Sequence, residues 1–216
     1  NIDIKRSNLR ANININLTNT TKIAVKFYSL FERYNGPSIS ANDIFGSVMQ
    51  ANPANFPKFF TYEDNLGYNH TLFGNKGNGG FPNPYADMVK GYKDRFTNTI
   101  LSQVQIEQDL NFITEGLRFR GMASVRTFTM NENSREYTPF YYGMAEVETE
   151  QGILNYLYRI QEGTEFLNNP SVDNLGTSRF YYEFVTEYNR KFKELHDVGG
   201  LLVFNCLLYT SDAADE

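Results

Sequence analysis

Residues 8–17 read Asn-Leu-Arg-Ala-Asn-Ile-Asn-Ile-Asn-Leu, so polar and apolar side chains alternate strictly. Successive side chains of a β-strand point to opposite faces of a sheet, and this stretch therefore predicts a strand with one apolar and one polar face. Its length is close to that of a tilted membrane-spanning β-strand, roughly 9–11 residues. A half-buried strand of a soluble β-sandwich shows the same alternation, so the segment alone leaves the surroundings of its apolar face open.

The alternation recurs along the rest of the chain. Further strands are predicted at residues 22–34, 94–110, 117–130, 179–191 and 198–204. Short links at 18–21, 111–116 and 192–197 join the strands in pairs, and long irregular stretches at 35–93 and 131–178 separate the pairs. If neighbouring strands are antiparallel, all short turns lie at one end of the sheet and all long loops at the other, as in outer-membrane barrels. The pattern predicts an all-β fragment of a transmembrane barrel, an open, curved antiparallel sheet of about six long strands.

The two long stretches hold weaker structural signals. Residues 40–50 predict one short helix, because Ser40 can cap it, Asp43 takes the capping-box position and apolar residues recur at helical spacing. Residues 140–148 and 153–160 are strand-like and predict a hairpin inside the second stretch. Connections of this length are usually functional, so these loops are the first place to look for a binding site.

The last eleven residues differ from the rest of the chain. Residues 206–216, Cys-Leu-Leu-Tyr-Thr-Ser-Asp-Ala-Ala-Asp-Glu, resemble the translation of a sequencing-library adapter, so we expect an artefactual, disordered tail after residue 205. Without the three carboxylates of this tail the net charge changes from −5 to −2. Cys206 is the single cysteine, which leaves residues 1–205 without thiol chemistry. Because Asn1 is not an initiator methionine and no signal peptide precedes the first strand, we expect a fragment cut at both ends.

The titratable residues do not form the patterns that enzymes use. His70 and His196 have no partners at metal-ligand spacing, and the glycine-rich run 74–80 lacks the Lys-Ser/Thr of a phosphate loop. Three glutamates at residues 146, 148 and 150 fall on one side of an extended segment instead of forming the opposed pair of a glycosidase. With weak basic patches and a charge near −2, nucleic acid is not an expected partner. We therefore expect no enzyme activity, no metal and no cofactor.

Five motifs occur together in the order and with the loop spacing of a known family. They are Asp43-Ile-Phe-Gly-Ser-Val-Met49, Asn83-Pro-Tyr-Ala-Asp87 followed by Gly91-Tyr92, Gln108-Asp-Leu-Asn-Phe-Ile-Thr-Glu-Gly-Leu117, Phe119-Arg-Gly-Met-Ala-Ser124, and His196-Asp-Val-Gly-Gly-Leu-Leu-Val203. Through them, residues 1–205 resemble the barrel region of the SusC/RagA family, the TonB-dependent outer-membrane transporters of Bacteroidetes.

The resemblance also implies the architecture and the partners of the complete transporter. It implies a barrel of about 22 strands in the outer membrane, in contact with lipid and filled by an internal plug. The transporter would import oligosaccharides or peptides beneath a SusD-like lipoprotein lid, powered by the TonB complex. The plug domain, through which the TonB complex acts, is absent from this sequence.

Seven polar strand residues would face the lumen of such a barrel. They are Asn8, Arg10, Asn12, Asn14, Arg118, Arg120 and Arg126. We expect them to form a hydrated wall or to support the plug more than to contact substrate, because a barrel lumen requires polar side chains in any case.

Loop aromatics and amides are the candidates for contact with substrate or lid. They are Tyr62, Tyr68, Phe73, Phe81, Asn83 and Tyr85. Aromatic rings can stack on sugar rings while amides bond hydroxyl groups. The same residues can instead pack the loops together or form the interface with the lid, and these two roles together are the stronger expectation.

One alternative from a different class stays open at this point. The chain can be a surface glycan-binding β-protein without transport activity, either soluble or lipid-anchored. The two hypotheses differ over the apolar strand face that includes Leu9, Ile13 and Val104. This face contacts lipid in a transporter and forms a core in a binding protein.

Overall fold

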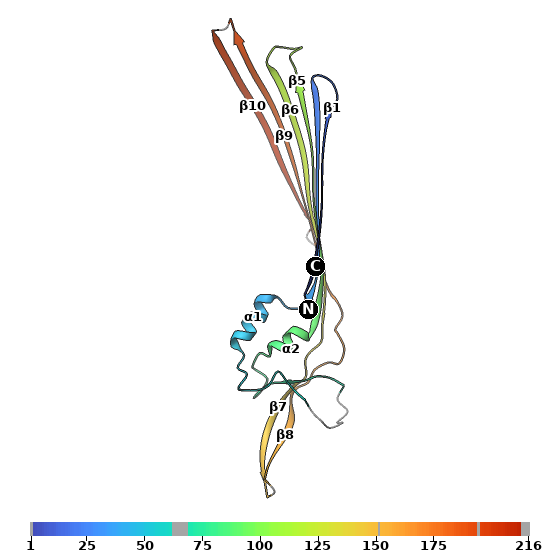
Figure 1. The fold of residues 1–216 in the computed structure, drawn as a ribbon, viewed down its shortest axis with the longest axis vertical. Helices are drawn as coiled ribbons and strands as arrows, with labels where there is room; N and C mark the ends of the chain where they lie inside the picture. The colour runs from blue at the N-terminus through green and yellow to red at the C-terminus, as the bar shows by residue number, and fades with distance from the viewer. Residues whose placement is uncertain (1, 62–68, 151, 194, 213–216) are drawn as a thin grey trace. The chain divides into compact units, whose positions relative to one another are not determined.

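The structure, a computed structural model, describes residues 2–61, 69–150, 152–193 and 195–212. Strands make up 66% of the chain and helices 8%, so the fold is all-β as the alternation predicts. Six long strands form one open antiparallel sheet in the order β1-β2-β5-β6-β9-β10 (Figure 1). Their bounds are β1 Asp3–Asn16, β2 Thr21–Pro37, β5 Gly91–Asp109, β6 Leu117–Glu136, β9 Ser171–Phe192 and β10 His196–Asp212.

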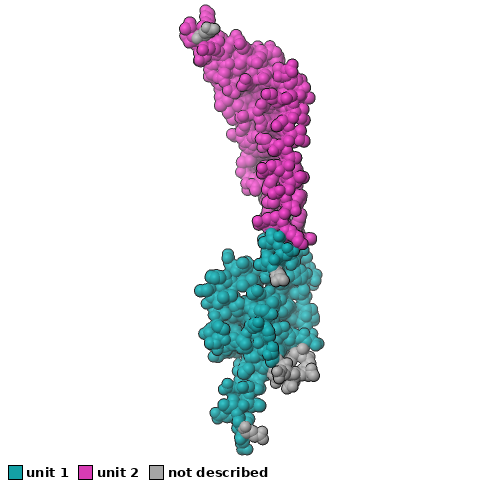
Figure 2. All heavy atoms as spheres, in the orientation of Figure 1, with its two compact units in different colours: residues 1–4, 34–95, 132–172 teal, residues 5–33, 96–131, 173–216 magenta. Residues whose placement is uncertain are grey.

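The chain divides into two compact units (Figure 2). Unit 1 comprises residues 1–4, 34–95 and 132–172, and unit 2 comprises residues 5–33, 96–131 and 173–216. The connections between β1 and β2, β5 and β6, and β9 and β10 all fall in unit 2. Both long connections, β2 to β5 and β6 to β9, fall in unit 1. The predicted alternation of short turns and long loops is therefore confirmed.

Unit 1 holds the regular structure of the two long loops. Its second sheet has the order β3-β4-β7-β8, with β4 and β7 parallel and the other pairs antiparallel. The elements are α1 Ala41–Gln50, β3 Phe59–Phe60, β4 Leu72–Gly74, α2 Pro84–Val89, β7 Tyr141–Thr149 and β8 Gly152–Gln161. A small core of Leu72, Phe140 and Tyr142 joins β4 to β7, with Phe60 and Leu157 packed against it. The predicted helix and the predicted hairpin are both present.

In unit 2 the alternation sorts side chains onto two faces of the sheet. On one face, Phe184 of β9 stacks with Phe119 of β6 and Phe204 of β10, with ring centroids 6.2 and 6.3 Å apart. On the other face, Arg120 of β6 pairs with Glu183 of β9 at 3.4 Å. Arg120 follows Phe119 in β6, and Glu183 precedes Phe184 in β9. Because successive side chains of a strand point to opposite faces, the apolar contact and the charged contact lie on opposite sides of the sheet. We call the two surfaces the apolar face and the polar face.

Two features differ from the expectations. The tail expected to be disordered continues β10 to Asp212, with Leu207 opposite Tyr181 and Leu208 opposite Phe180. Tyr209 and Thr210 have high β-propensity, and β9 provides backbone partners for this segment as far as Gly176. The adapter origin of residues 206–216 stays a prediction, and residues 213–216 lie outside the described residues.

A second helix, α2, was also not expected. The available signal was Asn83-Pro84, an N-cap residue followed by proline at the first helical position, with Asp87 in the first turn. The helix spans only six residues, too few for an apolar periodicity to be recognised.

Candidate functional site

The polar face of unit 2 carries a groove of about 530 Å³. Strands β2, β5, β6, β9 and β10 all contribute to its lining. Three cationic and four anionic side chains line it: Lys22, Arg118, Arg120, Glu107, Asp109, Glu183 and Glu187. The groove therefore carries charges of both signs, and it is not a basic surface of the kind that binds nucleic acid.

Ion pairs between neighbouring strands organise the groove. Arg118 Nε lies 3.2 Å from Asp109 Oδ1, across β5 and β6, and Arg120 Nη2 lies 3.4 Å from Glu183 Oε1, across β6 and β9. Tyr181 donates a hydrogen bond of 2.7 Å to the other oxygen of Glu183. Both arginines are about half or more exposed, so solvent screens the pairs and each contributes about 0–1 kcal/mol to stability. The pairs fix side-chain positions more than they stabilise the sheet.

The seven residues predicted to face a lumen have different surroundings in the structure. Arg118 and Arg120 lie together in the groove, and Asn14 lines a neighbouring groove of about 370 Å³. The Arg10 guanidinium lies over the Tyr28 ring, with 5.4 Å between its carbon and the ring centroid. The remaining three, Asn8, Asn12 and Arg126, are exposed residues of β1 and β6.

Sequence reasoning missed an apolar part of this groove. Leu201 and Val203 of β10 line it beside Val185 of β9, and Val203 pairs directly with Val185. The signal was the uninterrupted apolar run Leu201 to Phe204, in which both faces of the strand are apolar. The groove therefore offers charged groups along most of its length and an apolar wall at β10.

The loop candidates of unit 1 separate into buried and exposed residues. Phe73 is 1% exposed and Asn83 is 2% exposed, so in this structure both take the packing role that the sequence left open for the loop residues. Phe73 packs against the rings of Tyr85 and Tyr141. Phe81 and Tyr85 are 43% and 37% exposed and stay available to a ligand. The other two candidates, Tyr62 and Tyr68, lie outside the described residues.

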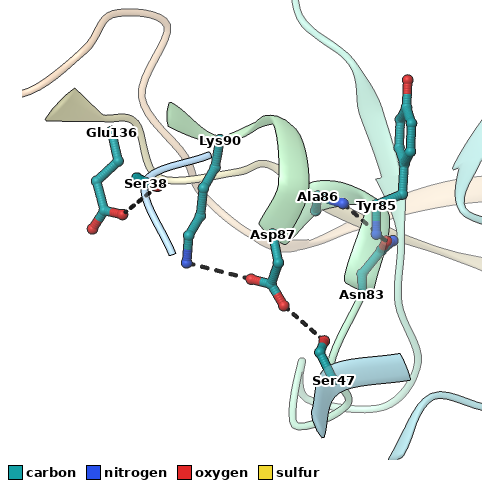
Figure 3. A network of polar contacts seen from close by, with 8 residues as sticks. All are labelled: Ser38, Ser47, Asn83, Tyr85, Ala86, Asp87, Lys90 and Glu136. Atoms are coloured by element: carbon teal, nitrogen blue, oxygen red, sulfur yellow. Dashed lines mark hydrogen bonds and ion pairs between the residues drawn. The ribbon is translucent and has the colours of Figure 1, made fainter. Parts of the chain in front are cut away.

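Asn83 is a structural residue because its amide is fully used within unit 1. Its Nδ2 donates to the backbone oxygens of Lys58 and Gly74 at 2.9 and 2.8 Å. Its Oδ1 accepts from the backbone N–H of Tyr85 and Ala86 at 3.2 and 3.1 Å, which caps α2. In Figure 3 the Tyr85 ring points away from this amide.

A short polar network joins α1 to α2. Ser40 caps α1 by accepting from the Asp43 backbone N–H at 3.2 Å, as the sequence predicts. Ser47, buried on α1, donates a 2.8 Å hydrogen bond to Asp87 of α2, and Lys90 pairs with the same carboxylate at 3.3 Å (Figure 3). This network sets the relative position of the two helices within unit 1.

A pocket of about 280 Å³ lies between the C-terminal end of α1 and the start of α2. We call it the loop pocket. Its apolar lining comes from Val48, Ala51, Pro53, Phe56, Pro84 and Tyr85. Lys58 also lines it, and its ammonium lies 4.9 Å from the Phe59 ring centroid and 5.3 Å from that of Tyr85. Lys58 was not among the residues predicted from sequence, because an isolated exposed lysine has no pattern that marks it.

Two further titratable residues of unit 1, His70 and Tyr141, lie among aromatic side chains. The His70 ring stacks on Phe140 with 3.8 Å between centroids, and its Nε2 lies 2.8 Å from the Tyr142 hydroxyl. Burial, with smaller contributions from Asp87 and Tyr137, raises the pKa of Tyr141 to about 12. Within the described part of the chain, no group of three or more His, Cys, Asp or Glu side chains is placed to hold a metal ion.

Two further observations bear on the class of protein. Across the residues that the structure describes, none of the helices is both long and apolar enough to cross a membrane. No protein-family model matches the sequence, and no curated protein matches it either. The geometry of the sheet and loops is therefore the basis for a functional proposal.

Proposed function

We propose that this chain is part of the wall and outer loops of an outer-membrane β-barrel of the SusC/RagA type. In that role it belongs to a TonB-dependent importer of oligosaccharides or peptides that works with a SusD-like lipoprotein. The observation that carries the proposal is the division of one long-stranded sheet into a continuous apolar face and a charged, grooved face. A membrane barrel needs this division, with apolar side chains outward and polar ones inward.

The exposure of the apolar face supports a lipid contact. Ile13 is 54% exposed, Val104 is 49% exposed and Phe204 is 60% exposed. These residues lie on β1, β5 and β10, so the exposed apolar side chains span the sheet from edge to edge. Soluble monomers rarely expose contiguous apolar patches larger than a few hundred Å². Lipid tails cover such a surface without loss of solubility, whereas a soluble glycan-binding protein would need a second layer over it.

The distribution of connections supports the same proposal. The sheet joins its strands through three short turns in one unit and through two long, structured loops in the other. Outer-membrane barrels combine short periplasmic turns with long extracellular loops in this way. The long loops then become the part of the protein that meets substrate first.

The decisive experiment compares arginine on the two faces of β1. In the full-length protein, Ile13→Arg places a charge on the apolar face, at a cost of roughly 2–4 kcal/mol near the bilayer midplane. We expect it to abolish the heat-modifiable species in the outer-membrane fraction. Asn12→Arg, on the polar face of the same strand, is the matched control and should accumulate at the normal level.

Two outcomes would count against the proposal. Normal recovery of a folded, heat-modifiable Ile13→Arg protein from the outer membrane would show that this face does not contact lipid. A wild-type protein that is water-soluble, and is merely destabilised by Ile13→Arg, would favour the surface glycan-binding alternative.

A further inference from the structure

We propose that the loop pocket binds the C-terminal residue of a peptide, with an apolar side chain inside the pocket and the carboxylate on Lys58. The inference deepens the proposed function and rests on it for its biological meaning, since it assigns a peptide substrate in place of an oligosaccharide. The binding event itself depends only on residues of unit 1.

The lining of the pocket excludes a sugar as its best occupant. Its walls are mostly apolar, and the one buried amide, Asn83, already makes four hydrogen bonds within the protein. A sugar ring entering this space would turn most of its hydroxyl groups toward apolar walls, and an unpaired buried polar group costs about 1–3 kcal/mol. An apolar side chain has no hydrogen bonds to lose in the same transfer, and the removal of its surface from water favours binding.

The size of the pocket fits a single residue. Its volume of about 280 Å³ lies just below the range of ordinary ligand pockets, roughly 300–1,000 Å³. One leucine- or phenylalanine-sized side chain fits into such a space, whereas a longer ligand must extend out of it. The rest of a peptide would therefore lie on the exposed surface beside Phe81 and Tyr85.

Lys58 supplies the charge that selects a carboxylate. Its ammonium lies over the rings of Phe59 and Tyr85 at the pocket, and among the described residues no carboxylate pairs with it. A ligand carboxylate would give this cation its first oppositely charged partner there. Because the rings are neutral, they leave the positive charge of the lysine intact.

Asn52 distinguishes a peptide from a fatty carboxylate. It lines the same pocket, and its Oδ1 accepts from the Ala54 backbone N–H at 3.0 Å. That bond leaves the Nδ2 group of Asn52 to donate to a ligand, since among the described residues Nδ2 makes no hydrogen bond. A peptide carbonyl next to the C-terminal residue can accept this bond, and an acyl chain cannot.

The test measures binding of small probes to the purified full chain in detergent by calorimetry. The probes are N-acetyl-leucine, its neutral amide N-acetyl-leucinamide, octanoate and maltotriose. We expect N-acetyl-leucine to bind about threefold to fivefold more tightly than the amide, octanoate or maltotriose, which is the range that one exposed charge contact supplies. Lys58→Gln should remove the preference for the acid over the amide.

Lys76→Gln is the matched control, because Lys76 is an exposed lysine of the same unit outside the pocket. It should bind the acid like the unsubstituted protein. Val48→Glu, at a half-exposed wall position, should weaken the acid and leave the fold intact. Equal binding of acid and amide, a preference that survives Lys58→Gln, tighter binding of octanoate or maltotriose, or no binding of the acid would each overturn the inference.

The result is separate from the test of the proposed function. A protein that assembles in the outer membrane but ignores N-acetyl-leucine retains the transporter proposal and loses this inference. A protein that binds N-acetyl-leucine through Lys58 but is water-soluble retains the pocket and loses the transporter proposal.

Discussion

Phe119 of β6 and Phe184 of β9 stack with ring centroids 6.2 Å apart and with 19° between their planes. Their immediate neighbours in each strand, Arg120 and Glu183, meet on the opposite face at 3.4 Å. One pair of strands thus makes an apolar contact and a charged contact at the same level. The two contacts have different physical origins, and substitutions can separate them.

The aromatic contact should show a measurable coupling energy. Stacked pairs with centroids between 4.5 and 7 Å contribute about 0.5–1.5 kcal/mol beyond the area that they bury. We expect a double-mutant cycle of Phe119→Leu and Phe184→Leu to give a coupling in this range from denaturant unfolding. A coupling near zero would show that the two rings act independently.

The charged contact should contribute less and respond to salt. Arg120 is 49% exposed and Glu183 is 21% exposed. Exposed pairs contribute about 0.2–1 kcal/mol, and the screening length falls from about 10 Å at 0.1 M salt to about 3 Å at 1 M. Glu183→Gln should therefore lower the unfolding free energy slightly at low salt and by less at high salt. A large loss that is insensitive to salt would instead point to the hydrogen bond from Tyr181.

Gly116 should tolerate no side chain. Its φ is +83°, and an added Cβ would lie 1.8 Å from the backbone oxygen of Asn189. Gly116 O also accepts a 2.9 Å hydrogen bond from the Asn189 backbone N–H, which holds the turn against β9. Gly116→Ala should reduce the unfolding free energy by about 2–4 kcal/mol, through strain and the loss of this bond. Gly200→Ala is the control, because no atom lies within 4 Å of its added Cβ.

Asn83 should be required for the loop structure of unit 1. Asn83→Ala removes the cap of α2 and the two hydrogen bonds that Asn83 Nδ2 donates to the carbonyls of Lys58 and Gly74. The combined cost should be about 2–4 kcal/mol of local stability. Hydrogen exchange of α2 and β4 should accelerate, while the strands of unit 2 keep their protection. Unchanged exchange in α2 would contradict the role assigned to this amide.

Alkaline pH should destabilise unit 1 through Tyr141. Burial is the largest cause that raises its pKa from 10.0 to about 12, followed by Asp87 and Tyr137. Since the folded state favours the neutral phenol, this contribution to stability is complete below pH 10 and is lost as the pH rises toward about 12. Tyr141→Phe should flatten the loss of stability over that interval. A tyrosinate titration by ultraviolet absorbance checks the pKa directly, and ionisation at the ordinary value would contradict it.

The strands of the long sheet could be predicted because each carries its own signal. Residues 8–17 alternate strictly, and their strand assignment depends on no distant contact. The helix that begins after Ser40 was equally local, because its cap and its apolar spacing lie within eleven residues. Local patterns of this kind predict an element without knowledge of its tertiary contacts.

The site could not be predicted as well, because burial in the loops depends on distant partners. Phe73 and Tyr85 are both loop aromatics in the sequence, yet one is in the interior and the other is exposed. Their difference arises from the pairing of β4 with β7, which lie about seventy residues apart in the chain. The Lys58 ammonium lies over the ring of Tyr85, which is distant in the sequence, so no local pattern predicts this contact either.

The long sheet consists of three hairpins side by side, β1–β2, β5–β6 and β9–β10. Its two outermost strands therefore run in opposite directions. Duplication or deletion of a whole hairpin leaves the direction and facing of every other strand unchanged, whereas insertion of a single strand moves a short turn to the end occupied by the long loops. Sheets of this kind can widen in evolution or in design by steps of two strands, and each step brings one more loop on which new specificity can arise.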